Sequence, residues 1–136
     1  MDISQRFVGI FGAVILVVHI ILTILNSYTF SLVDDLMSLI GGIWLALLFF
    51  SFFKHFVNEH IHHHATEKIK ILIIVLSFVC LLGFLWESQE FIFSELFSVY
   101  LQQSIGGMIS DIALNIIGGL IIGAVLIFRK KKEIVS

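Results

Sequence analysis

Four blocks of apolar residues constrain this chain more than any other feature, because each is long enough to cross a lipid bilayer. A helix needs about 20 predominantly apolar residues to span the hydrocarbon core of a membrane. The blocks are residues 7–25, 36–53, 69–90 and 109–128. We therefore predict an all-α fold, an integral membrane bundle of four transmembrane helices.

The composition supports the same conclusion. Of the 136 residues, 59% are hydrophobic and 13% are charged, whereas soluble domains average about 45–50% and about 25%. The length allows one compact bundle, so we predict a single transmembrane domain over residues 1–136. Its main partner is expected to be the lipid bilayer, and no nucleic-acid partner is expected.

The segment between the third and fourth blocks has a different character. Residues 91–108, FIFSELFSVYLQQSIGGM, are amphipathic and rich in aromatic side chains. Polar residues interrupt this segment too often for it to span a membrane. We predict that it lies in the membrane interface or re-enters the bundle.

The basic residues predict the orientation. All eight Lys and Arg residues fall in three places: before the first span, in or just after the His-rich loop 54–68, and in the tail 129–136. With four spans, these three places share one side, which the positive-inside rule makes cytoplasmic. We therefore predict a multi-pass protein of the cell membrane with both termini in the cytoplasm.

Acidic residues gather at the opposite ends of the predicted spans and share helix faces with small residues. Residues three or four apart lie on one face of a helix, and small residues let helices pack closely in lipid. If these faces meet, five polar residues converge near the outer surface. The predicted ligand- or cation-binding residues are Asp35, Glu87, Glu90, Asp111 and Asn115.

Such a cluster needs compensation, because neighbouring carboxylates repel one another. It can hold protons, bind the cationic group of a ligand, or bind a divalent cation. Oxygen ligands suit Ca²⁺, Mg²⁺ or Mn²⁺, so one of these ions is the candidate cofactor. The alternative is that acids such as Asp34 and Asp111 are solvated helix caps. That alternative fits Glu87 and Glu90 poorly, since a helix C-terminus disfavours acids.

Three segments resemble a known family in order and spacing. DDLMSLIGGIWLALLF, WESQEF and DIALNIIGGLIIG are similar to the motifs of VanZ-like membrane proteins, named for a teicoplanin-resistance protein. The Glu87-x-x-Glu90 pair is closer to uncharacterised relatives that carry Glu-x-x-Glu. The chain has Ser38 where the family usually has His, and no Arg before the last motif. The resemblance implies a multi-pass envelope protein with an acidic outer pocket.

Histidines suggest two further sites. In the loop, His60 with His63 or His64 has the spacing of a weak metal site, although a solvated loop with pH-dependent charge is the alternative. His19 lies inside the first span, where an ionisable residue is a functional candidate. We expect it to relay protons by pairing with Glu87 or Asp111, or to be neutral and bonded to a neighbouring span.

Three functions remain open from the sequence. The preferred one is a binding protein whose outward-facing acidic pocket takes a cation or an envelope or cell-wall ligand. Enzymatic activity is not favoured, because the outer side has no Ser–His pair and no Lys or Arg for phosphate; a hydrolase would need an acid-held metal. The alternatives are a cation- or proton-coupled transporter acting as a homo-oligomer, and an accessory subunit packed against a membrane-protein partner.

Overall fold

The chain folds into helices throughout the part that the structure describes. The computed structural model describes residues 4–25, 27, 30–60, 65–97 and 104–128, and these ranges contain no strand. This confirms the predicted all-α class. The helices are α1 (Gln5–Ile24), α2 (Ser31–Phe52), α3 (Lys54–His60), α4 (Ala65–Phe97) and α5 (Ile105–Phe128).

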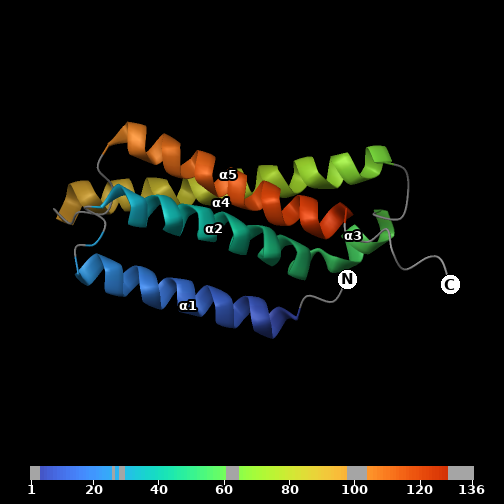
Figure 1. Ribbon diagram of the computed structural model, residues 1–136, viewed down its shortest axis with the longest axis horizontal. Coiled ribbons are helices and arrows are strands. Elements are labelled where there is room, and N and C mark those ends of the chain that lie inside the picture. The colour runs from blue at the N-terminus through green and yellow to red at the C-terminus, as the bar shows by residue number, and fades with distance from the viewer. Residues whose placement is uncertain (1–3, 26, 28–29, 61–64, 98–103, 129–136) are drawn as a thin grey trace.

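Four of these helices, α1, α2, α4 and α5, are long and apolar enough to cross a membrane. They run in alternating directions, so that α1 begins and α5 ends at the same end of the bundle (Figure 1). We call this end, which also holds α3, the basic end. The opposite end, where α2 and α5 begin, we call the acidic end.

Helix α2 is the centre of the bundle and contacts each of the other four helices. Its closest partner is α5, because glycines remove the side chains that would keep the two backbones apart. A Cβ atom on Gly42 would overlap the backbone carbonyl of Asn115, and one on Gly118 would overlap that of Leu39. Small residues therefore bring these helices together, as the sequence pattern predicts.

The apolar core fills the half of the bundle near the basic end. Phe49 is its centre, with ring centroids 4.8 Å from Phe53, 5.4 Å from Phe78 and 5.8 Å from Phe50. The buried hydrophobic cluster draws on α2, α3, α4 and α5: Leu45, Ala46, Phe49, Phe50, Val57, Ile71, Val75, Val79 and Ile127. The other half of the bundle is left for polar side chains.

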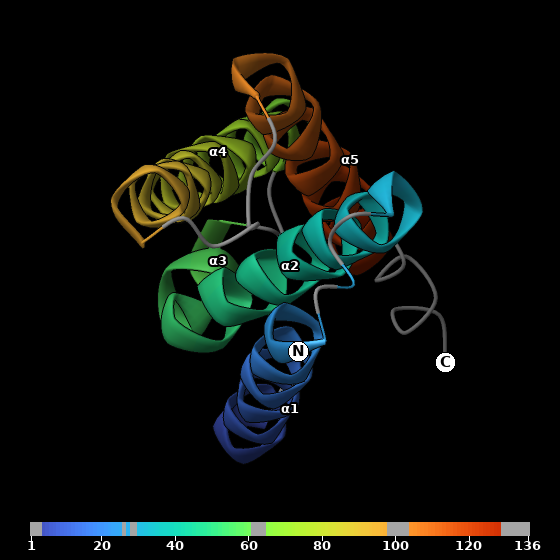
Figure 2. The ribbon, with the colours of Figure 1, turned by 90° about the vertical axis from the view of Figure 1, so that its left-hand side faces the viewer.

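Helix α1 stands apart from this core. Among the described helices its backbone approaches that of α2 alone, and α1 and α4 lie on opposite sides of α2 (Figure 2). Two contacts join α1 to α2 near the basic end: the Trp44 indole N–H donates to the Val8 carbonyl at 3.0 Å, and the Trp44 ring covers Gly12.

The helices extend beyond the predicted spans. Residues 91–97, assigned by the sequence to an interfacial or re-entrant segment, continue α4, and residues 105–108 begin α5; residues 98–103 lie outside the described part. No Gly or Pro interrupts the chain between Gly83 and Gly106, so the helix continues. Likewise α3 forms within the predicted loop 54–68, where its Val57 joins the core.

The close α2–α5 contact gives a direct test. We expect Gly42→Ala to lower the free energy of unfolding by about 1–3 kcal/mol, because the added methyl forces the backbones apart. Gly9→Ala is the matched control, since its Cβ meets no atom within 4 Å and alanine is the better helix former. Unfolding in detergent measures both, and equal stability of the two variants would contradict the packing argument.

Candidate functional site

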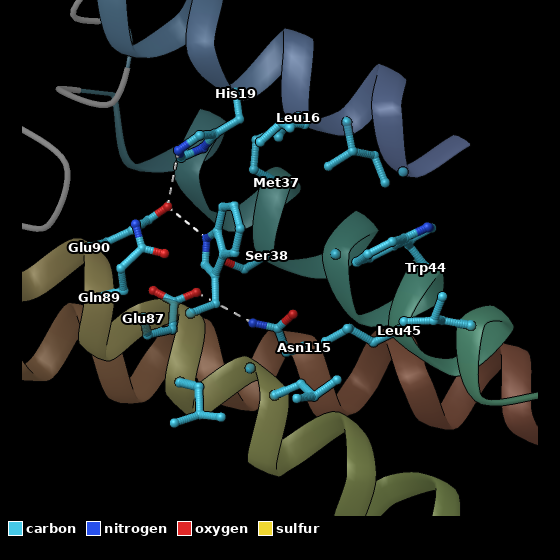
Figure 3. Close-up of a pocket in the computed structure, with 18 of the residues that line it drawn as sticks. Leu16, His19, Met37, Ser38, Trp44, Leu45, Glu87, Gln89, Glu90 and Asn115 are labelled. Carbon is cyan, nitrogen blue, oxygen red and sulfur yellow. Dashed lines mark hydrogen bonds and ion pairs between the residues drawn. The ribbon is translucent and has the colours of Figure 1, made fainter. Parts of the chain in front are cut away.

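A cavity of about 580 Å³ begins among the polar side chains of the acidic half and extends toward the basic end. Helices α1, α2 and α4 form its walls, and α5 contributes Asn115. Its polar side chains face one another from different helices, while leucines, Met37 and Trp44 line the remainder (Figure 3). The polar lining residues with ionisable or hydrogen-bonding groups are His19, Asp34, Ser38, Glu87, Gln89, Glu90 and Asn115.

Glu90 links two helices at this site. One of its oxygens, Oε1, accepts the indole N–H of Trp86 at 2.7 Å and lies 3.4 Å from Nε2 of His19. The His19 and Trp86 rings also meet edge to face, with centroids 5.2 Å apart. The sequence predicted Glu87 or Asp111 as the partner of His19, whereas the structure places Glu90 there. The reason is that Glu90 lies one turn beyond Trp86, on the side of α4 that faces α1.

Asn115 joins the other half of the cluster. Its Nδ2 donates to the backbone carbonyl of Asp111 at 3.0 Å and, at the long distance of 3.4 Å, to Oε1 of Glu87. The side chain fits because its neighbours are glycines: a Cβ on Gly41 would lie 3.2 Å from Asn115 Oδ1, and one on Gly83 would lie 3.4 Å from Asn115 Cβ. The small-residue faces therefore create the space that this amide occupies.

The structure brings together four of the five predicted site residues. Glu87, Glu90, Asp111 and Asn115 are each at most 4% exposed, although Asp111 is not among the residues that line the cavity.

Helix α2 contributes a different carboxyl from the one chosen by sequence. Asp34 lines the cavity and Asp35 does not. Neighbouring residues on a helix point about 100° apart, so only one of the two faces the cavity. Phe30 occupies the N-cap of α2, so Asp34 and Asp35 are not N-caps. Asp111 lies inside α5, so it is not an N-cap either.

The carboxyl groups outnumber the basic groups around the cavity. Asp34, Glu87, Glu90 and Asp111 lie close enough to repel one another electrostatically. Residues 7–53 and 71–128 contain no Lys or Arg, and His19 is the one basic side chain among the residues that line the cavity. The site is therefore rich in hydrogen-bond acceptors and poor in positive charge.

The described residues offer no ready-made metal site. In the ranges that the structure describes, no three His, Cys, Asp or Glu side chains are grouped so that they could hold a metal ion. The predicted loop site lies largely outside those ranges: His63 and His64 are not described, and His60 is described only as the last residue of α3. In the same helix, His55 Nε2 lies 3.1 Å from Glu59 Oε1 on the surface.

The contact between α1 and α4 can be measured by a double-mutant cycle. We expect His19→Ala and Glu90→Gln to be non-additive in stability, with a coupling free energy of about 0.5–3 kcal/mol, because the two side chains touch. The control cycle pairs His19→Ala with Glu95→Gln, since Glu95 is exposed on the same helix. Additivity within error in both cycles would show that the His19–Glu90 contact contributes nothing to stability.

Comparison with known proteins identifies the family. A search of curated proteins and a search of solved structures gave no match. A family model described as "Predicted membrane protein (DUF2238)" matches residues 4–132. This match does not test the resemblance to VanZ-like proteins, which stays a prediction. With this coverage and four helices able to cross a membrane, the chain belongs to the DUF2238 family of predicted membrane proteins.

Proposed function

We propose that this membrane protein is a binding protein whose cavity takes a positively charged organic group, an ammonium, at the acidic end. The observation that carries the proposal is a cluster of carboxyl groups at a cavity with one histidine as its basic lining residue: Asp34, Glu87 and Glu90 line the cavity, and Asp111 lies close to them.

The physical argument starts from burial. A carboxylate taken out of water is costly unless it is paired and hydrogen-bonded. At an effective dielectric constant of about 20, two like charges 4 Å apart repel by about 4 kcal/mol. A cationic ligand offsets both penalties at once. An ammonium group donates up to three charge-assisted hydrogen bonds, and the carboxyl, serine and amide oxygens around the cavity are suitable acceptors.

An organic cation fits the geometry better than a bare metal ion. Ca²⁺ and Mg²⁺ need several oxygen ligands within about 2.0–2.6 Å, and among the described residues no three His, Cys, Asp or Glu side chains are grouped so that they could hold a metal ion. The cavity volume of about 580 Å³ falls within the roughly 300–1,000 Å³ typical of small-molecule sites. A divalent cation is therefore the alternative outcome of the test below.

The packing of the basic half bears on whether the protein binds its ligand or transports it. The Phe49 cluster packs the basic half of the bundle, and the cavity wall nearer that end is apolar, so the described part offers no polar route from the carboxyls to the basic end. This favours a binding role over the transporter that the sequence left open. The resemblance to VanZ-like proteins implies that the ligand is an envelope component. A homo-oligomer or a membrane-protein partner stays a prediction.

Ligand-dependent stability tests the proposal. We expect ethylammonium to stabilise the purified protein, by about 2.7 kcal/mol at 100 times its dissociation constant. Glu87→Gln and Glu90→Gln should weaken this gain, because each removes a carboxylate from the cavity, whereas Glu95→Gln should preserve it. Thermal unfolding in detergent is measured for each variant with and without ligand.

The same measurement includes Mg²⁺, Ca²⁺ and Mn²⁺. Stabilisation by a divalent ion alone, lost in Glu87→Gln, would replace the organic cation by a metal. No ligand-dependent change in any arm would overturn the proposed function.

The orientation forms part of the proposal, because it puts the carboxyl cluster at the outer face of the membrane. We expect a fluorescent protein fused to the C-terminus to be fluorescent and alkaline phosphatase fused there to be inactive. The same phosphatase inserted between α4 and α5 should be active. The reverse pattern would place the carboxyl cluster at the cytoplasmic face.

A further inference from the structure

The cavity is long and follows the helix axes. Its lining residues extend on α2 from Asp34 to Leu48 and on α1 from His19 to Gly9. At 1.5 Å per residue these stretches cover about 21 Å and about 15 Å. An ammonium group alone would occupy only a small part of such a space.

The chemistry of the walls changes along this length. The carboxyl groups lie toward the acidic end, and Gly9, Gly12, Trp44, Leu45 and Leu48 line the part nearer the basic end. A cavity with acceptors at one end and apolar walls along the rest matches an amphiphile with a polar head and a hydrocarbon chain.

One wall of the cavity is formed by α1, which lies at the edge of the bundle. Among the described helices, the backbone of α1 approaches only α2, and α1 lies on the far side of α2 from α4 (Figure 2). Across this gap His19 reaches from α1 to Glu90 and Trp86 on α4. No residue of α3 lines the cavity. Helices α1 and α4 are both long and apolar enough to cross a membrane, so the cavity wall to which both contribute lies at the depth of the lipid.

We infer that the ligand is a single-chain membrane amphiphile with an ammonium head group, which enters sideways from the bilayer between α1 and α4. Its head lies among Asp34, Glu87 and Glu90, and its chain lies between α1 and α2 along Trp44. This inference rests on the proposed function, whose cation site it extends into a lipid site.

The head group must supply the selectivity. Lipid chains are as apolar as the cavity wall, so moving a chain from the bilayer into the cavity brings little hydrophobic gain. A charge-assisted hydrogen bond of ordinary strength changes affinity by about tenfold or more. Amphiphiles with the same chain and different heads should therefore differ in affinity by at least about tenfold.

The chain carries its own reporter for this test. It has two tryptophans, Trp44 and Trp86, and both line the cavity. Bromine quenches tryptophan fluorescence on contact, so a bromine at the tail of an amphiphile reports occupation of the apolar part. The probes are ω-bromoundecyl amphiphiles with ammonium, hydroxyl and carboxylate heads, added to the full chain in lipid nanodiscs. We expect saturable quenching by the ammonium probe at a concentration at least about tenfold below the other two.

Two variants locate the head and the tail. Glu90→Gln should bring the ammonium probe to the level of the hydroxyl probe. Gly9→Leu should reduce quenching by the bromine, because the new side chain enters open space at the tail end of the cavity. Stabilisation by ethylammonium should survive Gly9→Leu. The control is Ile10→Leu, an exposed position on α1 that does not line this cavity.

Each outcome decides between the two proposals. If ethylammonium stabilises the protein through Glu87 and Glu90 but no probe quenches saturably, the lipid inference is wrong and the cation site stands. If selective quenching persists unchanged in Gly9→Leu, the chain lies elsewhere and the inference is wrong. If all three heads quench alike while ethylammonium still stabilises the protein, the lipid inference is wrong and the cation site stands. If neither assay detects binding, both the inference and the proposed function fail.

Discussion

The close approach of α2 and α5 is the contact on which the rest of the structure depends. Gly42 and Gly118 let each backbone reach a carbonyl of the other helix, and lipid offers no hydrophobic force that could replace such contact. The same approach places Asn115 against Gly41 and Gly83. The polar cluster is therefore assembled by the packing of small residues, and a change that separates α2 from α5 would disperse it.

The bundle divides its two tasks along its length. The Phe49 cluster packs the basic half with apolar side chains, whereas the acidic half buries carboxyl groups, and buried charged groups are weak evidence of a role in stability. Groups of this kind inside a membrane protein are functional candidates by default. The network of His19, Glu90 and Trp86 also fixes these side chains in space, so a ligand would meet oxygens that are already oriented.

Periodicity predicted much of this arrangement, because a helix of known type places its faces without any tertiary information. Glu87, Glu90 and Asn115 were found in this way. The choice between Asp34 and Asp35 could not be made, since it depends on a rotation of about 100° that only neighbouring helices settle. The partner of His19 and the cavity itself depend on where α1 docks, and that is set by the Trp44 contacts with Val8 and Gly12. Hydropathy also did not predict that α4 continues through Phe97, because Glu, Ser and Gln residues interrupt the apolar pattern after Trp86.

The position of α1 connects the fold to the ligand. Among the described helices, the backbone of α1 approaches that of α2 alone, and the core cluster contains no residue of α1. At one end its attachment is the Trp44 indole, and at the other it is His19 on Glu90. The second attachment uses the same carboxyl that would bind a cationic head group. A cationic group bound at Glu90, as proposed above, would therefore compete with His19 for the carboxyl that joins α1 to α4.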